Sequence, residues 1–253
     1  MRVFAISDLH LDYEQNQSWL RGLSQTDYLQ DVLILAGDIS DRLSILTLCF
    51  EQLERRFKQV LFVPGNHDLW TRRDEEKLTS FDKFDRVSEL ALNCGISMNS
   101  AHYDTLSIIP LLSWYDFSFG QPTDQLLQTW MDFRSCEWGS EIEPAGITQH
   151  FLALNEAVLQ SKNETIITFS HFLPRIDVMP SFIPLSMQYL YPVLGSSLID
   201  EQVRELSSSF HVYGHSHVNQ DIMIDGVRYF NNAFGYPSEE HLSFKKLRCI
   251  YEC

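Results

Sequence analysis

Five short apolar runs in this sequence each end in a polar cluster, and this recurrence constrains the fold more than any other feature. The clusters are Asp8-Leu9-His10, Gly37-Asp38-Ile39-Ser40-Asp41, Gly65-Asn66-His67-Asp68, Ser170-His171 and Gly214-His215-Ser216-His217. The run at 32–36 (Val-Leu-Ile-Leu-Ala) is continuously apolar, which is typical of a strand buried on both faces. In open α/β sheets, ligands gather outside the carboxyl ends of the strands. We therefore predict an α/β protein in which the five clusters meet at one place.

The rest of the chain alternates between strand and helix patterns. We expect one or two strands within 100–112, strands at 164–169 and 210–213, a hairpin at 221–224 and 227–230 around Asp225-Gly226, and a last strand at 242–251. Helical patterns cover residues 16–29, 43–57, 71–93, 147–161 and about 197–206.

The length of 253 residues suits one sizeable domain, which we expect to span residues 1–253. No internal repeat, low-complexity tract or linker divides it. Two segments stand out: an aromatic insertion at about 113–145 and an irregular loop at about 172–195, which carries four prolines. A long irregular loop in a compact domain is often functional.

The chain is acidic, with a formal net charge of −15. Affinity for long nucleic acid comes mainly from lysine and arginine on phosphates, so we expect no long nucleic acid as a partner. The same charge disfavours anionic membranes, and no apolar run is long enough to span a bilayer. We therefore expect no membrane contact. The sequence gives no signal for the oligomeric state.

Cysteine usage and the amino terminus together predict a cytoplasmic protein. The five cysteines are scattered without a CxxC pair, which suits a reducing compartment. Residues 1–6 run directly into the cluster at Asp8, leaving no room for a signal peptide.

The candidate ligands mix imidazole, carboxylate and one amide, with no thiolate. They are Asp8, His10, Asp38, Asn66, His171, His215 and His217. This donor set suits divalent or trivalent manganese, iron or zinc. Seven ligands are too many for one ion and suit two, if one carboxylate bridges. Two ions about 3.5–4 Å apart would bind a phosphate between them and hold a hydroxide for in-line attack.

His67 is more useful as an unligated side chain than as a ligand. A free imidazole there would donate a proton to the departing alkoxide. Asp68 or Asp41 would fix its tautomer by accepting from the other ring nitrogen, and the sequence does not choose between them. Asp41 has a competing interpretation as the N-cap of the helix at 43–57.

The aromatic stretch at 113–120, together with Trp130 and Trp138, also has two interpretations. It is either a secondary hydrophobic cluster beneath the insertion or a substrate wall with stacking rings, and the two are compatible.

The ordered clusters resemble those of the calcineurin-like metallophosphoesterases, in a bacterial-type form. The resemblance implies a four-layer α/β/β/α sandwich, with two mixed β-sheets flanked by helices and a dinuclear metal site at the strand carboxyl ends. It also implies that Asp8, His10, Asp38 and His217 hold one metal, and that Asp38, Asn66, His171 and His215 hold the other. His67 would contact phosphate and donate the proton. Asp41 would orient His67, and Arg42 and Asn66 would bind substrate.

Two departures from the family pattern argue against a serine/threonine protein phosphatase. The glycine that usually follows the Asp41-Arg42 pair is missing, and the later motif ends in Asp68 rather than glutamate. The residues from 114 to 138 match no family motif that would name a substrate.

Three functions are compatible with these residues. The leading one is a metal-dependent hydrolase of phosphomonoesters or phosphodiesters, with a small phosphate ester as the expected substrate. The second is a noncatalytic metal-binding scaffold or protein-interaction module of the same fold, which the filled ligand positions disfavour. The third is a nuclease or a cyclic nucleotide phosphodiesterase, which the charge permits for short substrates.

Overall fold

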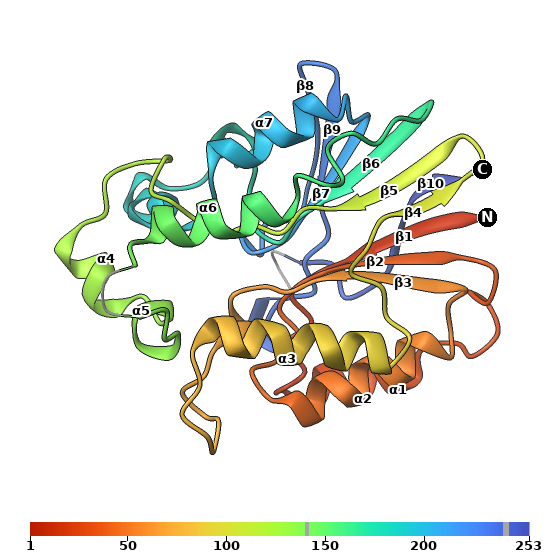
Figure 1. Cartoon of the computed structure of the whole chain (residues 1–253), viewed down its shortest axis with the longest axis horizontal. Coiled ribbons are helices and arrows are strands. Elements are labelled where there is room, and N and C mark those ends of the chain that lie inside the picture. The colour runs from red at the N-terminus through yellow and green to blue at the C-terminus, as the bar shows by residue number, and fades with distance from the viewer. Residues whose placement is uncertain (140–141, 240–242, 253) are drawn as a thin grey trace.

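Two β-sheets form the centre of the protein, which is described here from a computed structural model covering residues 1–139, 142–239 and 243–252. The four-stranded sheet has the order β10-β1-β2-β3, and the six-stranded sheet has the order β4-β5-β6-β7-β9-β8 (Figure 1). Strands β1, β2 and β3 are parallel, as are β5, β6, β7 and β9, and an antiparallel strand closes the edge at β10, β4 and β8. Both sheets are therefore mixed, as predicted.

The strands are short and close to the expected positions. Their bounds are β1 Arg2–Ile6, β2 Val32–Ala36, β3 Gln59–Val63, β4 Ala101–Tyr103, β5 Leu106–Pro110, β6 Thr165–Phe169, β7 Phe210–Tyr213, β8 Gln220–Ile224, β9 Val227–Asn231 and β10 Arg248–Glu252. The last strand starts later than predicted, and residue 242 of that prediction lies outside the described residues.

The α-helices are α1 Glu14–Gly22, α2 Leu43–Glu54, α3 Ser80–Asn93, α4 Asp124–Thr129, α5 Asp132–Ser135, α6 Pro144–Leu154 and α7 Ser197–Glu205. Short 3-10 segments lie at His67–Leu69 (η1), Ile176–Val178 (η2), Leu185–Val193 (η3) and Pro237–Glu239 (η4). None of the helices among these residues is long and apolar enough to cross a membrane.

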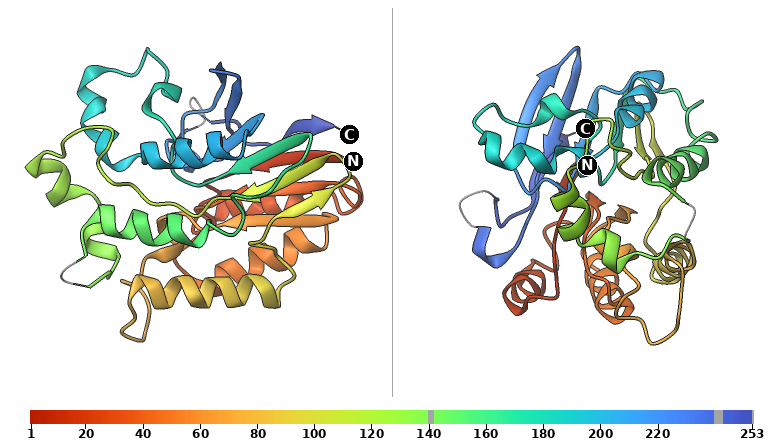
Figure 2. Two further views of the ribbon diagram at one scale, coloured as in Figure 1. Left: turned by 45° about the horizontal axis from the view of Figure 1, so that its top comes forward. Right: turned by 90° about the vertical axis from the view of Figure 1, so that its left-hand side faces the viewer.

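Successive side chains of a strand point to opposite faces of the sheet, and this alternation separates the layers. Val3 and Ala5 of β1 point into the cluster between the two sheets, whereas Phe4 and Ile6 pack on the helix side. Helices α1, α2 and α3 cover the outer face of the four-stranded sheet, and α6 and α7 cover that of the six-stranded sheet. Figures 1 and 2 show these helical layers on opposite sides of the sheets. The predicted four-layer sandwich is confirmed.

Several helix boundaries were predicted wrongly. The helix expected over 71–93 begins only at Ser80, because the side chain of Thr79 accepts from the Asp82 N–H and the Asp82 carboxylate accepts from the Thr79 N–H. Such a reciprocal capping box fixes a helix start. The N-cap of α2 is Arg42, without a side-chain cap, so the interpretation of Asp41 as N-cap was wrong. The helix expected over 147–161 starts earlier, with Pro144 in its first turn, and that over 16–29 ends at Gly22.

Candidate metal centre

The structure brings the seven predicted ligands together at the carboxyl ends of five strands. Asp8, His10, Asp38 and His217 each offer a donor atom, and these atoms lie within 4.8 Å of one another. Asp38, His171 and His215 form a second set under the same limit. The Asn66 Oδ1 atom joins that second set, at 3.1 Å from His171 Nε2. Asp38 is common to both sets, so the arrangement matches two neighbouring ion sites that share one carboxylate.

The backbone turns sharply where these side chains leave the strands. Among non-glycine residues, positive φ angles occur at Asp8 (54°), His10 (41°), Asp38 (58°), His215 (65°) and His217 (54°). The left-handed region is unfavourable for residues with a Cβ atom. Strained backbone of this kind is characteristic of functional sites.

Two glycines keep the centre open. A Cβ atom on Gly65 would collide with the Asp38 carboxylate, and one on Gly37 would lie 2.5 Å from His171 Nδ1. Gly37 also has a φ of +84°, which glycine adopts without steric cost. Both positions therefore need the glycine that the sequence supplies.

In the second set of donors, two ring nitrogens have lone pairs that point toward each other. His171 Nδ1 lies 2.9 Å from the Ala36 carbonyl oxygen, and His215 Nε2 lies 3.0 Å from the Val193 carbonyl oxygen. A carbonyl oxygen only accepts, so both ring nitrogens carry the proton. In the neutral rings, His171 Nε2 and His215 Nδ1 are then unprotonated, yet they face each other at 3.2 Å. Converging lone pairs without a hydrogen between them fit a cation.

The first set of donors concentrates negative charge. His217 lies between Glu239, 2.7 Å from Nδ1, and Asp8, 3.3 Å from Nε2. Burial alone would lower the pKa of His217, but Asp8 and Glu239 raise it to about 10. Burial and the neighbouring Asp8 raise the pKa of Asp38. The site therefore favours positive charge, and its nitrogen and oxygen donors fit divalent ions.

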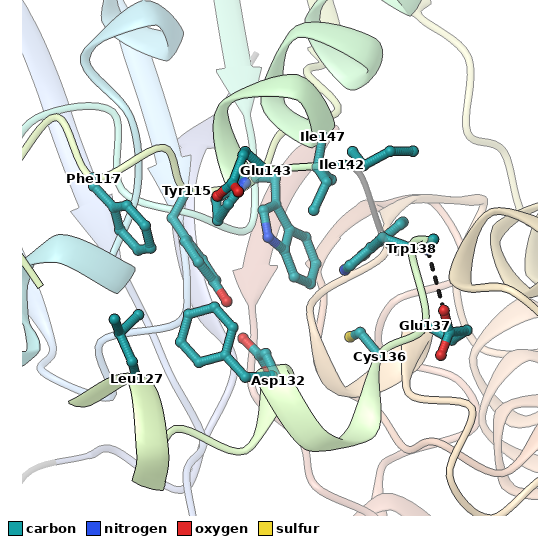
Figure 3. Close-up of a pocket in the computed structure, with 14 residues that line it drawn as sticks. Tyr115, Phe117, Leu127, Asp132, Cys136, Glu137, Trp138, Ile142, Glu143 and Ile147 are labelled. Carbon is teal, nitrogen blue, oxygen red and sulfur yellow. Dashed lines mark hydrogen bonds between the residues drawn. The ribbon is translucent and has the colours of Figure 1, made fainter. Parts of the chain in front are cut away.

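Asp132 is a buried partner of the centre that the sequence did not reveal. Its Oδ1 atom accepts from Asn66 Nδ2 at 2.8 Å and from the Trp70 indole at 2.7 Å, and its Oδ2 atom accepts from the Trp130 indole at 2.8 Å. Figure 3 shows the Tyr115 ring pointing toward the same carboxylate. The hydrogen bond from Asn66 to Asp132 orients the side-chain carbonyl oxygen of Asn66 toward His171. No sequence spacing predicts a residue such as Asp132, because it acts on the site through Asn66.

Glu239 and Tyr236 were also missed. Glu239 fixes the orientation of His217, as outer carboxylates commonly do for metal-binding histidines. The Tyr236 ring stacks on His10, with ring centroids 4.3 Å apart. Both residues follow the last recognisable cluster by about twenty positions, so local sequence reasoning could not reach them.

Asp68, one of the two candidates for orienting the His67 ring, binds backbone groups instead. Its carboxylate accepts from the backbone N–H groups of Asp38, Ile39, Ser40 and Gly65, at 2.8–3.0 Å. It therefore ties the loops after β2 and β3 together. The Asp41 carboxylate lies 3.3 Å from Arg73 Nη1. Within the described residues, no hydrogen bond joins the His67 ring to either aspartate.

His67 is held by stacking and by its backbone. Its ring stacks on Trp70 with a centroid distance of 3.7 Å, and its N–H donates to Asp38 Oδ1 at 2.9 Å. The ring nitrogen Nε2 lies 3.9 Å from Asp38 Oδ2, beside the ligand sets but outside both. Burial, and then the nearby His217, lower the pKa of His67 to about 3.

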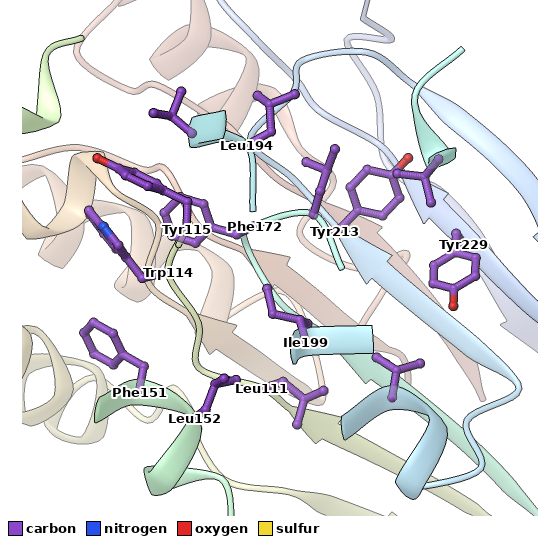
Figure 4. Packing of buried hydrophobic residues seen from close by; sticks show 14 of the residues in the cluster. Leu111, Trp114, Tyr115, Phe151, Leu152, Phe172, Leu194, Ile199, Tyr213 and Tyr229 are labelled. Atoms are coloured by element: carbon purple, nitrogen blue, oxygen red, sulfur yellow. The ribbon is translucent and has the colours of Figure 1, made fainter. Parts of the chain in front are cut away.

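The aromatic stretch joins the core. Trp114 and Tyr115 are each 1% exposed and pack against Phe172 (Figure 4). They line a cavity of about 480 Å³ whose wall consists almost entirely of residues of the insertion and includes no proposed ligand among the described residues. The hydrophobic-cluster interpretation therefore describes these two rings, whereas Trp130 approaches His215 with a centroid distance of 5.9 Å.

Comparison with known proteins agrees with this geometry. A family model described as calcineurin-like phosphoesterase matches residues 1–219. A curated relative, the "[Acyl-carrier-protein] phosphodiesterase PptH" of Mycobacterium tuberculosis, is 24% identical over 94% of this chain and 78% of its own length. The crystal structure of that organism's phosphopantetheinyl hydrolase PptH has a TM-score of 0.78 and 24% identity, and the match covers 100% of this chain and 96% of the other. A further solved structure matches at a TM-score of 0.56 and 14% identity, over 99% of both chains.

Proposed function

The chain belongs to the calcineurin-like phosphoesterase family, and from this premise we propose that it hydrolyses phosphodiesters with two metal ions that share Asp38. The observation that carries the proposal is the pair of facing, unprotonated nitrogens of His171 and His215, 3.2 Å apart beside the shared carboxylate. A cation bound between them would satisfy both lone pairs at once.

The assignment of ligands follows the two sets. Asp8, His10, Asp38 and His217 would hold one ion, and Asp38, Asn66, His171 and His215 the other. When bound, such ions polarise phosphate oxygens and lower the pKa of water. Manganese, iron and zinc all suit these donors.

His67 is the proposed proton donor to the leaving oxygen. In the free protein its ring is neutral at pH 7, because its pKa is about 3. An anionic phosphate beside the ring would raise that pKa, because an adjacent negative charge favours the imidazolium. Stacking on Trp70 limits the ring to an orientation that faces Asp38. Arg42 lines the same cavity as His67, which supports its proposed role in binding substrate.

A diester substrate is favoured over a monoester by similarity to the relative named as a phosphodiesterase. That relative's names also point to a phosphopantetheine group on an acyl carrier protein. We propose a carrier-protein phosphodiester as the candidate physiological substrate. Incubating holo and apo carrier protein with the enzyme, and measuring the protein mass, tests it: the holo form should lose its phosphopantetheine group and the apo form should not change.

Metal dependence is the first test of the catalytic proposal. Metal-stripped protein should not hydrolyse bis-p-nitrophenyl phosphate, and added manganese should restore turnover. Asp38→Asn should lose both activity and bound metal while remaining folded, because it removes charge from both sites. A folded Asp38→Asn protein that keeps two tightly bound ions would contradict the shared-ligand assignment. No turnover after reconstitution would favour the noncatalytic alternative.

His67 is tested through the leaving group. General acids contribute about 10²–10⁴ in rate. His67→Asn should lose about that range on an alkyl ester, whose alkoxide needs a proton. The loss on a p-nitrophenyl ester should be much smaller, with unchanged metal content. Equal losses on both esters would mean that His67 mainly binds phosphate.

A further inference from the structure

Two cavities of opposite character meet at the metal centre. The apolar cavity has a volume of about 650 Å³ and is lined largely by residues between 179 and 194, among them Met179, Met187, Leu190 and Leu194. Among the described residues that line it there is no lysine or arginine, and the one carboxylate, Glu239, lies 2.7 Å from His217 Nδ1. Phe182, at its rim, is 71% exposed, so the mouth of the cavity also presents an apolar surface.

The polar cavity has a volume of about 440 Å³ and is lined by His10 and His67. It is lined by Asp12, Asp41, Arg42 and Arg73, among others. Arg73 Nη1 lies 3.4 Å from Asp12 Oδ1 and 3.3 Å from Asp41 Oδ1. These donors and acceptors suit a hydroxylated or peptide arm, such as the carrier-protein side of the proposed substrate, and would desolvate at a cost against an alkyl chain.

The cavities are continuous with the metal centre. Tyr236 lines both. His217 lines the apolar cavity and His10 the polar one, and their Nε2 atoms are 3.0 Å apart. A phosphate held at these ligands would therefore direct one ester arm into each cavity.

The position of His67 decides which arm leaves. Of the two cavities, its ring lines the polar one. A general acid must come within about 2.6–3.2 Å of the oxygen that it protonates, so the leaving oxygen must lie on the polar side.

Building on the proposed hydrolytic function, we infer that the enzyme is selective for asymmetric phosphodiesters: the apolar arm keeps the phosphate, and the polar arm leaves as an alcohol. The oxygen of water forms a new bond to phosphorus as the bond from phosphorus to the polar arm's oxygen breaks. That oxygen takes the proton of His67, and a proton from the attacking water passes to solvent. The products are an apolar phosphomonoester and a polar alcohol.

A chain-length series tests the apolar cavity. We use p-nitrophenyl alkyl phosphates from methyl to octyl, which share one leaving group. Each fully buried methylene is worth up to about fourfold in binding, so burial of about three or four methylenes should raise kcat/KM by on the order of 10² along the series. Met187→Glu should flatten this rise, because it places a charge in the wall. The matched control is Leu92→Glu, on the 74% exposed Leu92 of α3, which should keep the wild-type slope.

The bond that breaks is tested with a glyceryl octyl phosphodiester, followed by phosphorus NMR. Octyl phosphate and glycerol are the expected products. Two results would overturn the inference: glycerol phosphate and octanol as the main products, or a wild-type series without chain-length dependence. In either case, turnover of bis-p-nitrophenyl phosphate would still support the proposed function. Absence of turnover on every diester with metal supplied would overturn both.

Discussion

Asp132 illustrates how much of this centre depends on a residue that touches no proposed ion. Its two oxygens accept three side-chain N–H groups, from Asn66, Trp70 and Trp130. The same carboxylate therefore orients a proposed ligand and the indole on which His67 stacks.

Asp132→Asn should weaken metal binding without removing a ligand. The new amide N–H₂ would face existing donors, so Asn66 would lose its fixed orientation. Losing an outer partner of a metal ligand typically costs about 10–100-fold in metal affinity or activity. Metal titration monitored by calorimetry measures this, with Asp124→Asn in the first turn of α4 as the control. Unchanged affinity in a folded Asp132→Asn protein would mean that Asn66 is oriented by other contacts.

His211, on β7, is a buried histidine outside the proposed ligand sets. The Ser170 hydroxyl donates to the Phe172 carbonyl oxygen, so it accepts from His211 Nε2 at 3.0 Å. Burial lowers the pKa of His211 to about 3, so the ring is neutral at pH 7. With the proton on Nε2, Nδ1 is left as an acceptor for the Thr168 hydroxyl, which lies 2.9 Å from it and 3.3 Å from the Phe210 carbonyl oxygen.

This histidine should make the fold less stable in mild acid. The unfolded chain binds a proton at His211 below about pH 6.5, whereas the folded chain does so only near pH 3. Stability is therefore lost as the pH falls through this window. From pH 7 to 5, wild type should lose about 2 kcal/mol more of unfolding free energy than His211→Gln. Urea unfolding at both pH values measures the difference, and His150→Gln, at an exposed position of α6, should behave as wild type.

At the scale of secondary-structure elements, strands and their ends were predicted better than helix starts. A run such as Val32–Ala36 carries its own signal, because every residue is apolar and a polar cluster follows. Residues 71–79 carry no comparable signal in their own sequence. They are held outside the helix by distant partners, such as the Ser135 carbonyl oxygen, which accepts from Thr71 N–H at 2.7 Å. Lys83 similarly reaches back to the Asp41 carbonyl oxygen and the Asp74 carboxylate.

The same distinction applies to the candidate site. The side chains that we assign as ligands follow the ends of strands by two to four residues, so the positions of the strands in the sequence already predicted that they meet. Asp132 and Glu239 approach the centre from remote segments, and a single sequence gives no register for such contacts. The positions of Asp41 and Asp68 relative to His67 depended on loop geometry in the same way.

The start of α3 can be tested directly. Thr79→Ala removes the side-chain acceptor of the capping box, and such losses cost about 0.5–2 kcal/mol. The unfolding free energy should fall by that amount, and the loop at 71–79 should exchange its amide hydrogens faster. Thr26→Ala, in an exposed loop, is the control. An unchanged unfolding free energy would show that the Lys83 contacts, and not the cap, fix this boundary.

At the scale of the whole molecule, the proposed ligands come from both sheets. Asp8, His10, Asp38 and Asn66 follow β1, β2 and β3 of the four-stranded sheet, whereas His171, His215 and His217 follow β6 and β7 of the six-stranded one. Each proposed ion therefore connects the two halves of the sandwich.

Metal removal should accordingly lower the thermal stability of the whole protein. An ion at 100 times its dissociation constant adds about 2.7 kcal/mol, and one kcal/mol shifts Tm by about 2–4 °C in a protein of this size. Two ions should thus raise Tm by about 10–20 °C. Scanning calorimetry with and without chelator measures the shift, and Asp38→Asn should show little of it. An equal Tm for loaded and stripped wild type would contradict ions that join the sheets.

The left-handed backbone at Asp8, His10, Asp38, His215 and His217 bears on directed evolution of this enzyme. Glycine relieves such a conformation, which costs a residue with a Cβ atom roughly 1–2 kcal/mol. A library screened for heat tolerance alone in chelating medium would therefore enrich glycine at these positions, and the survivors would fold well and bind no metal. At these five positions, the residue that favours thermal stability differs from the residue that supports turnover. A useful screen must therefore measure both properties in every round.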